Sequence, residues 1–88
     1  MTTNTATATA AAQNTVDVLV GIFRDVLRLP ELTADTDFYE AGGDSLTAFQ
    51  ITGRLQEILG ADVPVSLVFA YPTPQELAEV VDADYGTA

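Results

Sequence analysis

The 88-residue sequence predicts an all-α, four-helix bundle: three main helices, a short helix in third position, and a long loop between helices one and two. Apolar residues recur at helical spacing in the main segments. Thr, Pro and Gly residues that start or stop helices flank these segments. No segment is a convincing strand, since the one extended candidate, 63–65, contains Pro64.

The folded unit is expected to span residues 15–83, after a disordered Thr/Ala-rich tail at 1–14 and before a frayed C-terminus at 84–88. The tail has no large apolar residue after Met1. It therefore buries too little surface to offset the entropy lost on ordering. It also lacks the basic start and apolar stretch of a secretory signal.

The first helix is expected over residues 16–29, with Asn14 or Thr15 as its N-cap and Pro30 at its end. Its apolar positions share one face. They are Val16, Leu19, Val20, Phe23, Val26 and Leu27. The loop over residues 30–44 follows, and its apolar members are expected to pin it to the core. These are Leu32, Phe38 and Tyr39.

The second helix is expected from Ser45 to Leu59, with Gly60 as a left-handed cap. One stripe should face the core: Ala48, Ile51, Thr52, Leu55, Ile58 and Leu59. Leu46, Phe49 and Gly53 form a second stripe on an adjoining face. That second stripe is either a contact surface or the edge of a wide core stripe.

A short helical turn over residues 66–71 is expected next, with Ser66 as its cap. The last helix should begin at Pro74, with Thr73 as its cap and Glu76 three residues on. Its core face is expected to consist of Leu77, Val80 and Val81. Residues 82–88 are expected to fray.

The charge balance is strongly acidic, with thirteen Asp and Glu residues against three Arg, no Lys and a formal net charge of −10. A chain without a basic face is not expected to bind nucleic acid or anionic membranes. No apolar run has the length of a membrane helix. The cytoplasm is the simplest expectation for its location, and the chain is expected to be a monomer. The absence of cysteine excludes disulfides and thiolate metal sites.

Ser45 is the candidate functional residue, in the sequence AGGDSLTAFQ. The letters GDSL resemble a hydrolase block with a nucleophilic serine, but this chain has neither His nor Lys to act as base. The two glycines lack the Lys and the spacing of a phosphate loop. A carboxylate metal site does not match the calcium-loop pattern, and no metal site is expected. Its candidate ligands are Asp35, Asp37, Glu40 and Asp44.

Two interpretations of Ser45 remain open on the residues alone. Ser45 or Asp44 caps the second helix, or Ser45 is modified by another enzyme. A serine at a helix start projects its hydroxyl outward, next to backbone N–H groups that favour a phosphate. Gly42 and Gly43, having no side chains, allow a modifying enzyme to approach closely.

The segment DTDFYEAGGDSLTAFQITGRLQEILG resembles the core motif of peptidyl carrier proteins, the thiolation domains of nonribosomal peptide synthetases. VPVSLVFAYPTPQELAEVV resembles the second block of that family, and the two together cover about residues 16–82. Ala41 departs from the pattern, where a larger apolar residue is common. Acyl carrier proteins of fatty-acid or polyketide synthesis are the nearest alternative, and an unmodified helical interaction module is a more distant one.

The resemblance implies a carrier that is not itself an enzyme, with 4′-phosphopantetheine attached to Ser45. A Mg²⁺-dependent phosphopantetheinyl transferase would transfer that group from coenzyme A, and Mg²⁺ would be needed only there. An adenylating enzyme would then load an amino or aryl acid as a thioester. Condensation, tailoring or thioesterase enzymes would receive it. Met1, the low-complexity tail and the prompt C-terminal end favour a free-standing carrier of natural-product biosynthesis.

We expect partners and the modifying enzyme to recognise six residues, of which Leu46 and Phe49 lie where the resembled family contacts its partners. They are Gly42, Gly43, Asp44, Leu46, Phe49 and Leu67. Leu67 and Tyr71 occupy positions that are often polar or small in the family. If they are exposed, they extend the patch formed by Leu46 and Phe49, and such apolar patches mark interfaces.

Overall fold

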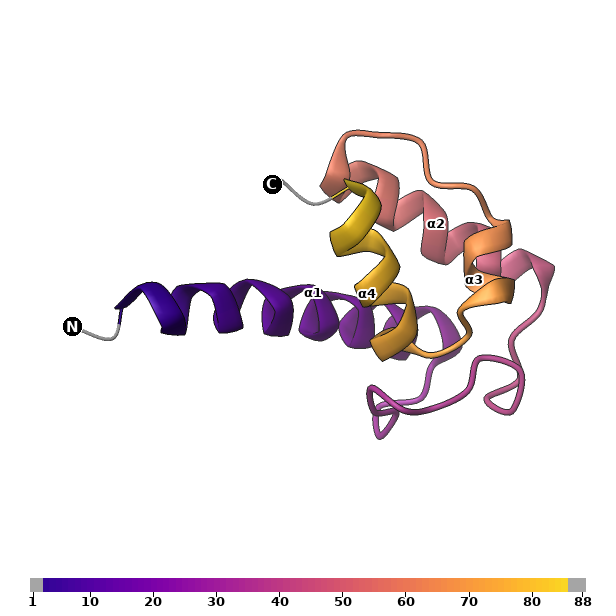
Figure 1. The fold of residues 1–88 in the computed structure, drawn as a ribbon. Coiled ribbons are helices and arrows are strands. Elements are labelled where there is room, and N and C mark those ends of the chain that lie inside the picture. Colours follow the sequence, from indigo (N-terminus) through magenta and orange to yellow (C-terminus); the bar gives the residue numbers. More distant parts are fainter. Residues whose placement is uncertain (1–2, 86–88) are drawn as a thin grey trace.

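The structure, a computed structural model, describes residues 3–85, and that part of the chain forms four helices. They are α1 (Thr3–Leu27), α2 (Ser45–Leu59), α3 (Ser66–Ala70) and α4 (Pro74–Tyr85). In Figure 1, α1 extends well beyond the other helices toward its N-terminus, and α4 lies against its C-terminal half. The expected all-α bundle, with a short third helix and a long loop after the first, is confirmed.

The start of α1 differs from the expectation. The helix begins at Thr3, so an N-cap at Asn14 or Thr15 is wrong, and the backbone from residue 3 to 14 is helical where a disordered tail was expected. Five alanines lie in this stretch, and alanine has the highest intrinsic helix propensity. Thr15 lies inside the helix, and its hydroxyl donates to Asp82 Oδ1 in α4 over 2.7 Å.

The division of the chain into a tail at 1–14, a carrier domain at 15–83 and an end at 84–88 stays a prediction. Residues 1–2 and 86–88 lie outside the described part. Fraying from residue 82 is not what the structure has, because α4 continues to Tyr85. No helix within residues 3–85 is long and apolar enough to cross a membrane.

The C-terminus of α1 lies at Leu27, two residues before the expected end at residue 29. Arg28 follows in the left-handed region, with φ of 59°. The N–H of Leu29 then donates to the carbonyl of Arg24 over 3.1 Å, which closes the helix end. The Arg24 side chain holds the next loop, since its Nε donates to the Leu32 carbonyl over 2.7 Å.

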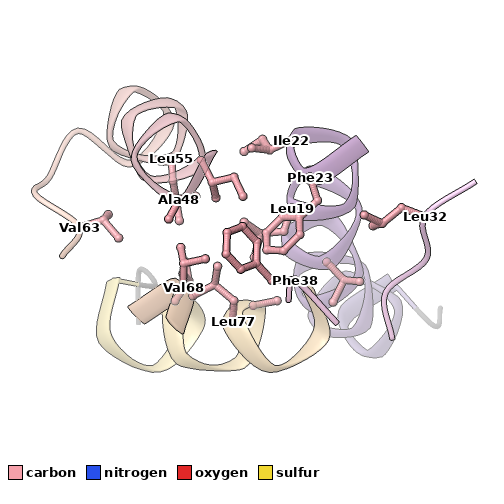
Figure 2. Packing of buried hydrophobic residues seen from close by; sticks show 14 residues of the cluster. Leu19, Ile22, Phe23, Leu32, Phe38, Ala48, Leu55, Val63, Val68 and Leu77 are labelled. Carbon is pink, nitrogen blue, oxygen red and sulfur yellow. The ribbon is translucent and has the colours of Figure 1, made fainter. Parts of the chain in front are cut away.

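The core lies where α1, α2 and α4 meet, and the long loop contributes to it (Figure 2). Phe38, from the loop, is fully buried and meets Phe23 of α1 and Phe69 of α3 edge to face, with ring centroids 6.2 and 6.0 Å apart. Leu32 is buried as well, so both residues pin the loop as expected. Because they anchor its two halves, the 30–44 segment is held without regular structure.

Most of the predicted core stripes are correct at their centres and less accurate at their edges. In α2, the buried residues are Ala48, Ile51, Thr52 and Leu55. Ile58 was assigned to the core, but its side chain is 58% exposed. Two buried residues, Ile22 of α1 and Ala78 of α4, were not in the predicted stripes. Val80 is only half-buried.

The helix caps follow local sequence closely. Gly60 ends α2 with φ of 67°, as predicted. Thr73 caps α4, because its Oγ1 accepts from the Glu76 N–H over 3.1 Å. Ser66 is a correction: it is the first residue of α3, and Val65 occupies the cap position with no side-chain hydrogen bond.

Candidate functional site around Ser45

The loop before α2 is folded tightly by its own backbone and by Asp37. The Asp37 carboxylate accepts from the backbone N–H of Tyr39 at 2.8 Å and of Glu40 at 3.2 Å. The Phe38 N–H donates to the carbonyl of Pro72 over 2.7 Å, and the Gly43 N–H to the carbonyl of Phe38 over 2.8 Å. These bonds fix the chain that leads into Ser45.

Both glycines before Ser45 have roles inside the fold. Gly42 has φ of +87°, a conformation that L side chains rarely adopt. Gly43 lies directly against the buried ring of Phe38, and a Cβ there would overlap the ring. The sequence had assigned these glycines to clearance for a modifying enzyme, and the structure gives each an intramolecular reason instead. Their part in recognition stays a prediction.

Asp44 is the N-cap of α2, so the question of which residue caps this helix is settled. Its Oδ1 accepts from the Thr47 N–H over 2.9 Å, and Thr47 Oγ1 accepts from the Asp44 N–H over 2.8 Å, forming a capping box. The hydrogen bond from the Thr47 backbone, aided by the Thr47 hydroxyl, lowers the pKa of Asp44. The N–H groups expected to seat a phosphate are therefore already occupied in part by this carboxylate.

Ser45 is the first residue of α2 and is exposed. Within residues 3–85 its hydroxyl has no hydrogen-bond partner, since the cap is made by Asp44. The hydroxyl is thus free to react with an incoming group. The candidate metal ligands in the preceding loop do not converge, because residues 3–85 contain no group of three or more His, Cys, Asp or Glu suited to a metal.

The second stripe on α2 is a surface rather than core. Leu46 is 65% exposed and Phe49 is 62% exposed, one turn apart on the helix that begins at Ser45. Leu67 is half-buried and packs against the core, and Tyr71 is 38% exposed. We refer to Leu46 and Phe49 as the α2 patch.

Tyr39 was expected to pin the loop to the core, and it acts differently. Its side chain is 53% exposed, and its ring stacks on Phe69 with centroids 6.2 Å apart. Its hydroxyl donates to the Phe69 carbonyl over 3.0 Å. Tyr39 therefore ties the loop before Ser45 to α3, a contact that sequence spacing gave no means of finding.

The family model for the phosphopantetheine attachment site matches residues 17–81, nearly all of the four-helix unit. The chain belongs to this family. A phosphopantetheine attachment domain of this kind is a carrier domain, whose covalent group is 4′-phosphopantetheine. The matched range includes Ser45 and parts of all four helices.

Similar proteins agree with the assignment of this attachment domain. This chain is 39% identical over 72 residues to a probable non-canonical nonribosomal peptide synthetase, CymA, of Salinispora arenicola. That match covers 82% of this chain, and the chain spans only 1% of the length of CymA.

Solved structures share the fold of the attachment domain. BlmI of Streptomyces verticillus, a type-II acyl carrier protein involved in bleomycin biosynthesis, superposes with a TM-score of 0.84 at 20% identity, over 89% of this chain and 94% of BlmI. A peptidyl carrier protein in complex with the phosphopantetheine transferase Sfp and coenzyme A gives a TM-score of 0.73 at 25% identity, covering 78% of this chain and 90% of that one.

Proposed function

We propose that Ser45 is the attachment residue for 4′-phosphopantetheine and that this chain is a peptidyl carrier. It transports an aminoacyl, aryl or peptidyl group as a thioester between partner enzymes in natural-product biosynthesis. The exposed, unpartnered hydroxyl of Ser45 at the start of α2 is the observation that carries the proposal. The match of the family to residues 17–81 and the similarity to a nonribosomal peptide synthetase support it.

The chain has two serines, and their surroundings distinguish them. Both are exposed, begin a helix and precede a leucine. Ser45 begins the 15-residue α2 behind a complete capping box, whereas Ser66 begins the five-residue α3, which has no side-chain cap. Only Ser45 is presented by a rigid helix start, so it is the residue that a modifying enzyme can position reproducibly.

The proton of the Ser45 hydroxyl must be accepted by the modifying enzyme. The chain has no His or Lys, and the neighbouring Asp44 is a poor base because its hydrogen bonds with Thr47 lower its pKa. In the transfer, the Ser45 oxygen bonds to the phosphorus that bears the pantetheine of coenzyme A. The nucleotide part leaves, and Mg²⁺ acts in the transferase only. Ser45 is thus a substrate and not a catalyst.

The attached group supplies a terminal thiol that holds the cargo as a thioester. Ser45 projects from the surface beside the α2 patch, so a partner that contacts Leu46 and Phe49 lies next to the attachment point. A phosphopantetheinyl transferase, an adenylating enzyme and the condensation, tailoring or thioesterase enzymes are the proposed partners. Tethering raises the effective concentration of cargo at each of their sites.

The test is incubation of the chain with the transferase Sfp, Mg²⁺ and coenzyme A, followed by intact-mass measurement. We expect one phosphopantetheine addition to the wild type and none to Ser45→Ala. Ser66→Ala is the matched control and should be modified like the wild type. An unmodified, folded wild type would contradict the proposal, as would an addition that survives Ser45→Ala.

Loading assays separate the peptidyl carrier from its alternatives. Adenylating enzymes for amino or aryl acids should charge the holo form, and the mass should rise by one acyl group. Charging only by acyl transferases of fatty-acid or polyketide synthesis would identify an acyl carrier instead. A chain that is never modified would be an unmodified helical interaction module.

A further inference from the structure

The exposed face of α2 continues past the α2 patch into a polar groove between α1 and α2. The groove has a volume of about 460 Å³. Its lining includes Asp25, Arg28, Gln50, Gly53, Arg54 and Glu57. Gln50, Gly53 and Glu57 follow Leu46 at i+4, i+7 and i+11, which places them on the same helix face. We call this depression the arginine groove.

The groove brings together charges of both signs, Arg28 and Arg54 with Asp25 and Glu57. Two of the three arginines in the chain, Arg28 and Arg54, line it, while Arg24 is bound to the loop carbonyl of Leu32. Arg54 Nη1 pairs with Asp25 at 3.0 Å, with both side chains at least half exposed. Arg28 forms no ion pair with any residue in the described range 3–85. The groove therefore holds one guanidinium, that of Arg28, with which no carboxylate of residues 3–85 pairs.

Two residues of this groove are poor choices for the fold alone. Arg28 adopts φ of 59°, where glycine is favoured. Gly53 lies inside α2, where glycine is unfavourable and where an added Cβ would meet nothing within 4 Å. A glycine at position 28 and an alanine at position 53 would both suit the local backbone better. Such choices concentrate at functional sites but are not confined to them, since Gly21 in α1 has the same open surroundings; Arg28 and Gly53 are distinguished because they line the same groove.

We propose that the arginine groove is the second half of the docking surface, and that it receives a carboxylate-bearing segment of a partner enzyme already seated on the α2 patch. This inference rests on the proposed carrier function. A guanidinium recognises a carboxylate with paired hydrogen bonds. A chain with a net charge of −10 disfavours acidic groups over most of its surface, so the unpaired guanidinium of Arg28 is the point at which an acidic partner segment would bind and set the docking register.

The test uses a panel of adenylating enzymes that load the holo-protein, with each variant first converted to the holo form and checked by mass. Arg28→Glu and Arg54→Glu should raise the KM for loading about tenfold or more, with kcat little changed, because an interfacial charge pair is replaced by repulsion. An enzyme in which the matching carboxylate residue is replaced by Lys should restore the KM of the Arg→Glu carrier variants, because the charge pair then forms with its signs reversed.

A second pair of variants separates docking from folding. Arg28→Gly and Gly53→Ala should have melting temperatures equal to or above that of the wild type, while both raise the loading KM. Gly21→Ala is the matched control: it lies in the interior of α1, outside the groove, and its Cβ also meets nothing within 4 Å. It should stabilise the protein without changing the loading KM.

Wild-type loading KM values for Arg28→Glu and Arg54→Glu would overturn the inference and leave the carrier function intact. Equal KM increases for Gly21→Ala and Gly53→Ala would also overturn it, because the effect would not be specific to the groove. If no enzyme loads a wild type that carries phosphopantetheine, the peptidyl carrier function fails, and the groove proposal fails with it. A wild type that accepts no phosphopantetheine contradicts the assignment of Ser45 instead.

Discussion

At the scale of single residues, Asp44 determines how α2 begins. Its carboxylate caps the helix next to Ser45, the proposed attachment residue, so one side chain has two consequences. Ser45 is left without a hydrogen bond to any residue of the described range 3–85, and the carboxylate occupies part of the positive helix end that a phosphate would otherwise use. The hydrogen bonds with Thr47 also lower the pKa of Asp44.

The lowered pKa of Asp44 makes a pH prediction. Because the carboxyl is more acidic in the folded state than its ordinary value of 3.8, the ionised form stabilises the fold. That contribution is fully present above pH 3.8 and is lost as the pH falls through the lower, folded-state pKa. Asp44→Asn keeps a capping side chain without the charge. Wild type should therefore be the more stable at pH 7, and the difference should shrink below pH 3.8.

Urea unfolding of wild type and Asp44→Asn at several pH values, followed by circular dichroism, measures this difference. The free energies of unfolding should converge on the acid side. A difference that stays constant with pH would mean that the charge of Asp44 is not what stabilises the helix start.

Gly43 gives a second residue-scale prediction. A methyl group there would overlap the Phe38 ring, which is fully buried among other core side chains. Gly43→Ala should lower the free energy of unfolding by about 1–3 kcal/mol through overpacking. The same urea titration measures it, and Gly21→Ala, whose Cβ has open space, is the control. An unchanged Gly43→Ala variant would show that the ring readily shifts.

At the scale of elements, α2 presents two different faces. Its buried face, centred on Ala48, Ile51 and Leu55, packs into the core, and its exposed face holds the α2 patch. The spacing of apolar residues predicted both stripes but did not predict which side chains are buried and which are exposed. It placed Ile58 in the core, although that residue lies on the edge of the helix that no neighbour covers.

The two faces of α2 respond differently to substitution. Phe49→Asp should change the free energy of unfolding by no more than about 0.5 kcal/mol, because Phe49 is 62% exposed. Leu55→Ala, on the buried face, should lower it by about 2–5 kcal/mol. Phe49→Asp should nevertheless impair loading by partner enzymes. Urea unfolding and loading kinetics check the two halves, and global unfolding of Phe49→Asp would show that Phe49 supports the core.

At the scale of the whole molecule, the net charge of −10 opposes folding through repulsion among like charges. Salt screens this repulsion, with a Debye length of about 10 Å at 0.1 M. The melting temperature should therefore rise by a few degrees between about 0.02 and 0.3 M NaCl, because the Debye length shortens as the ionic strength rises. Differential scanning fluorimetry measures the shift.

The control for this salt effect is a second series near pH 4, where the carboxyl groups are partly protonated. The rise should be much smaller there, because less repulsion remains to be screened. A melting temperature that falls with salt at neutral pH would mean that attractive pairs, such as Arg54–Asp25, outweigh the net repulsion.

The sequence by itself determined the features that depend on residues three or four apart. The bounds of α2, the αL cap at Gly60 and the Thr73 cap of α4 all follow from such neighbours. The position of Ser45 at a helix start follows for the same reason. The helical start of α1 agrees with the high helix propensity of its alanines, which is also a local property of the sequence.

Only the tertiary structure decided what lies next to what. It buried Ile22, exposed Ile58, bound Tyr39 to α3 and placed Phe38 against Gly43. It also brought Arg28, which directly follows α1, and Arg54 of α2 into one groove. A periodic pattern states which residues share a face of a helix, but contacts between segments distant in the sequence determine which faces are covered.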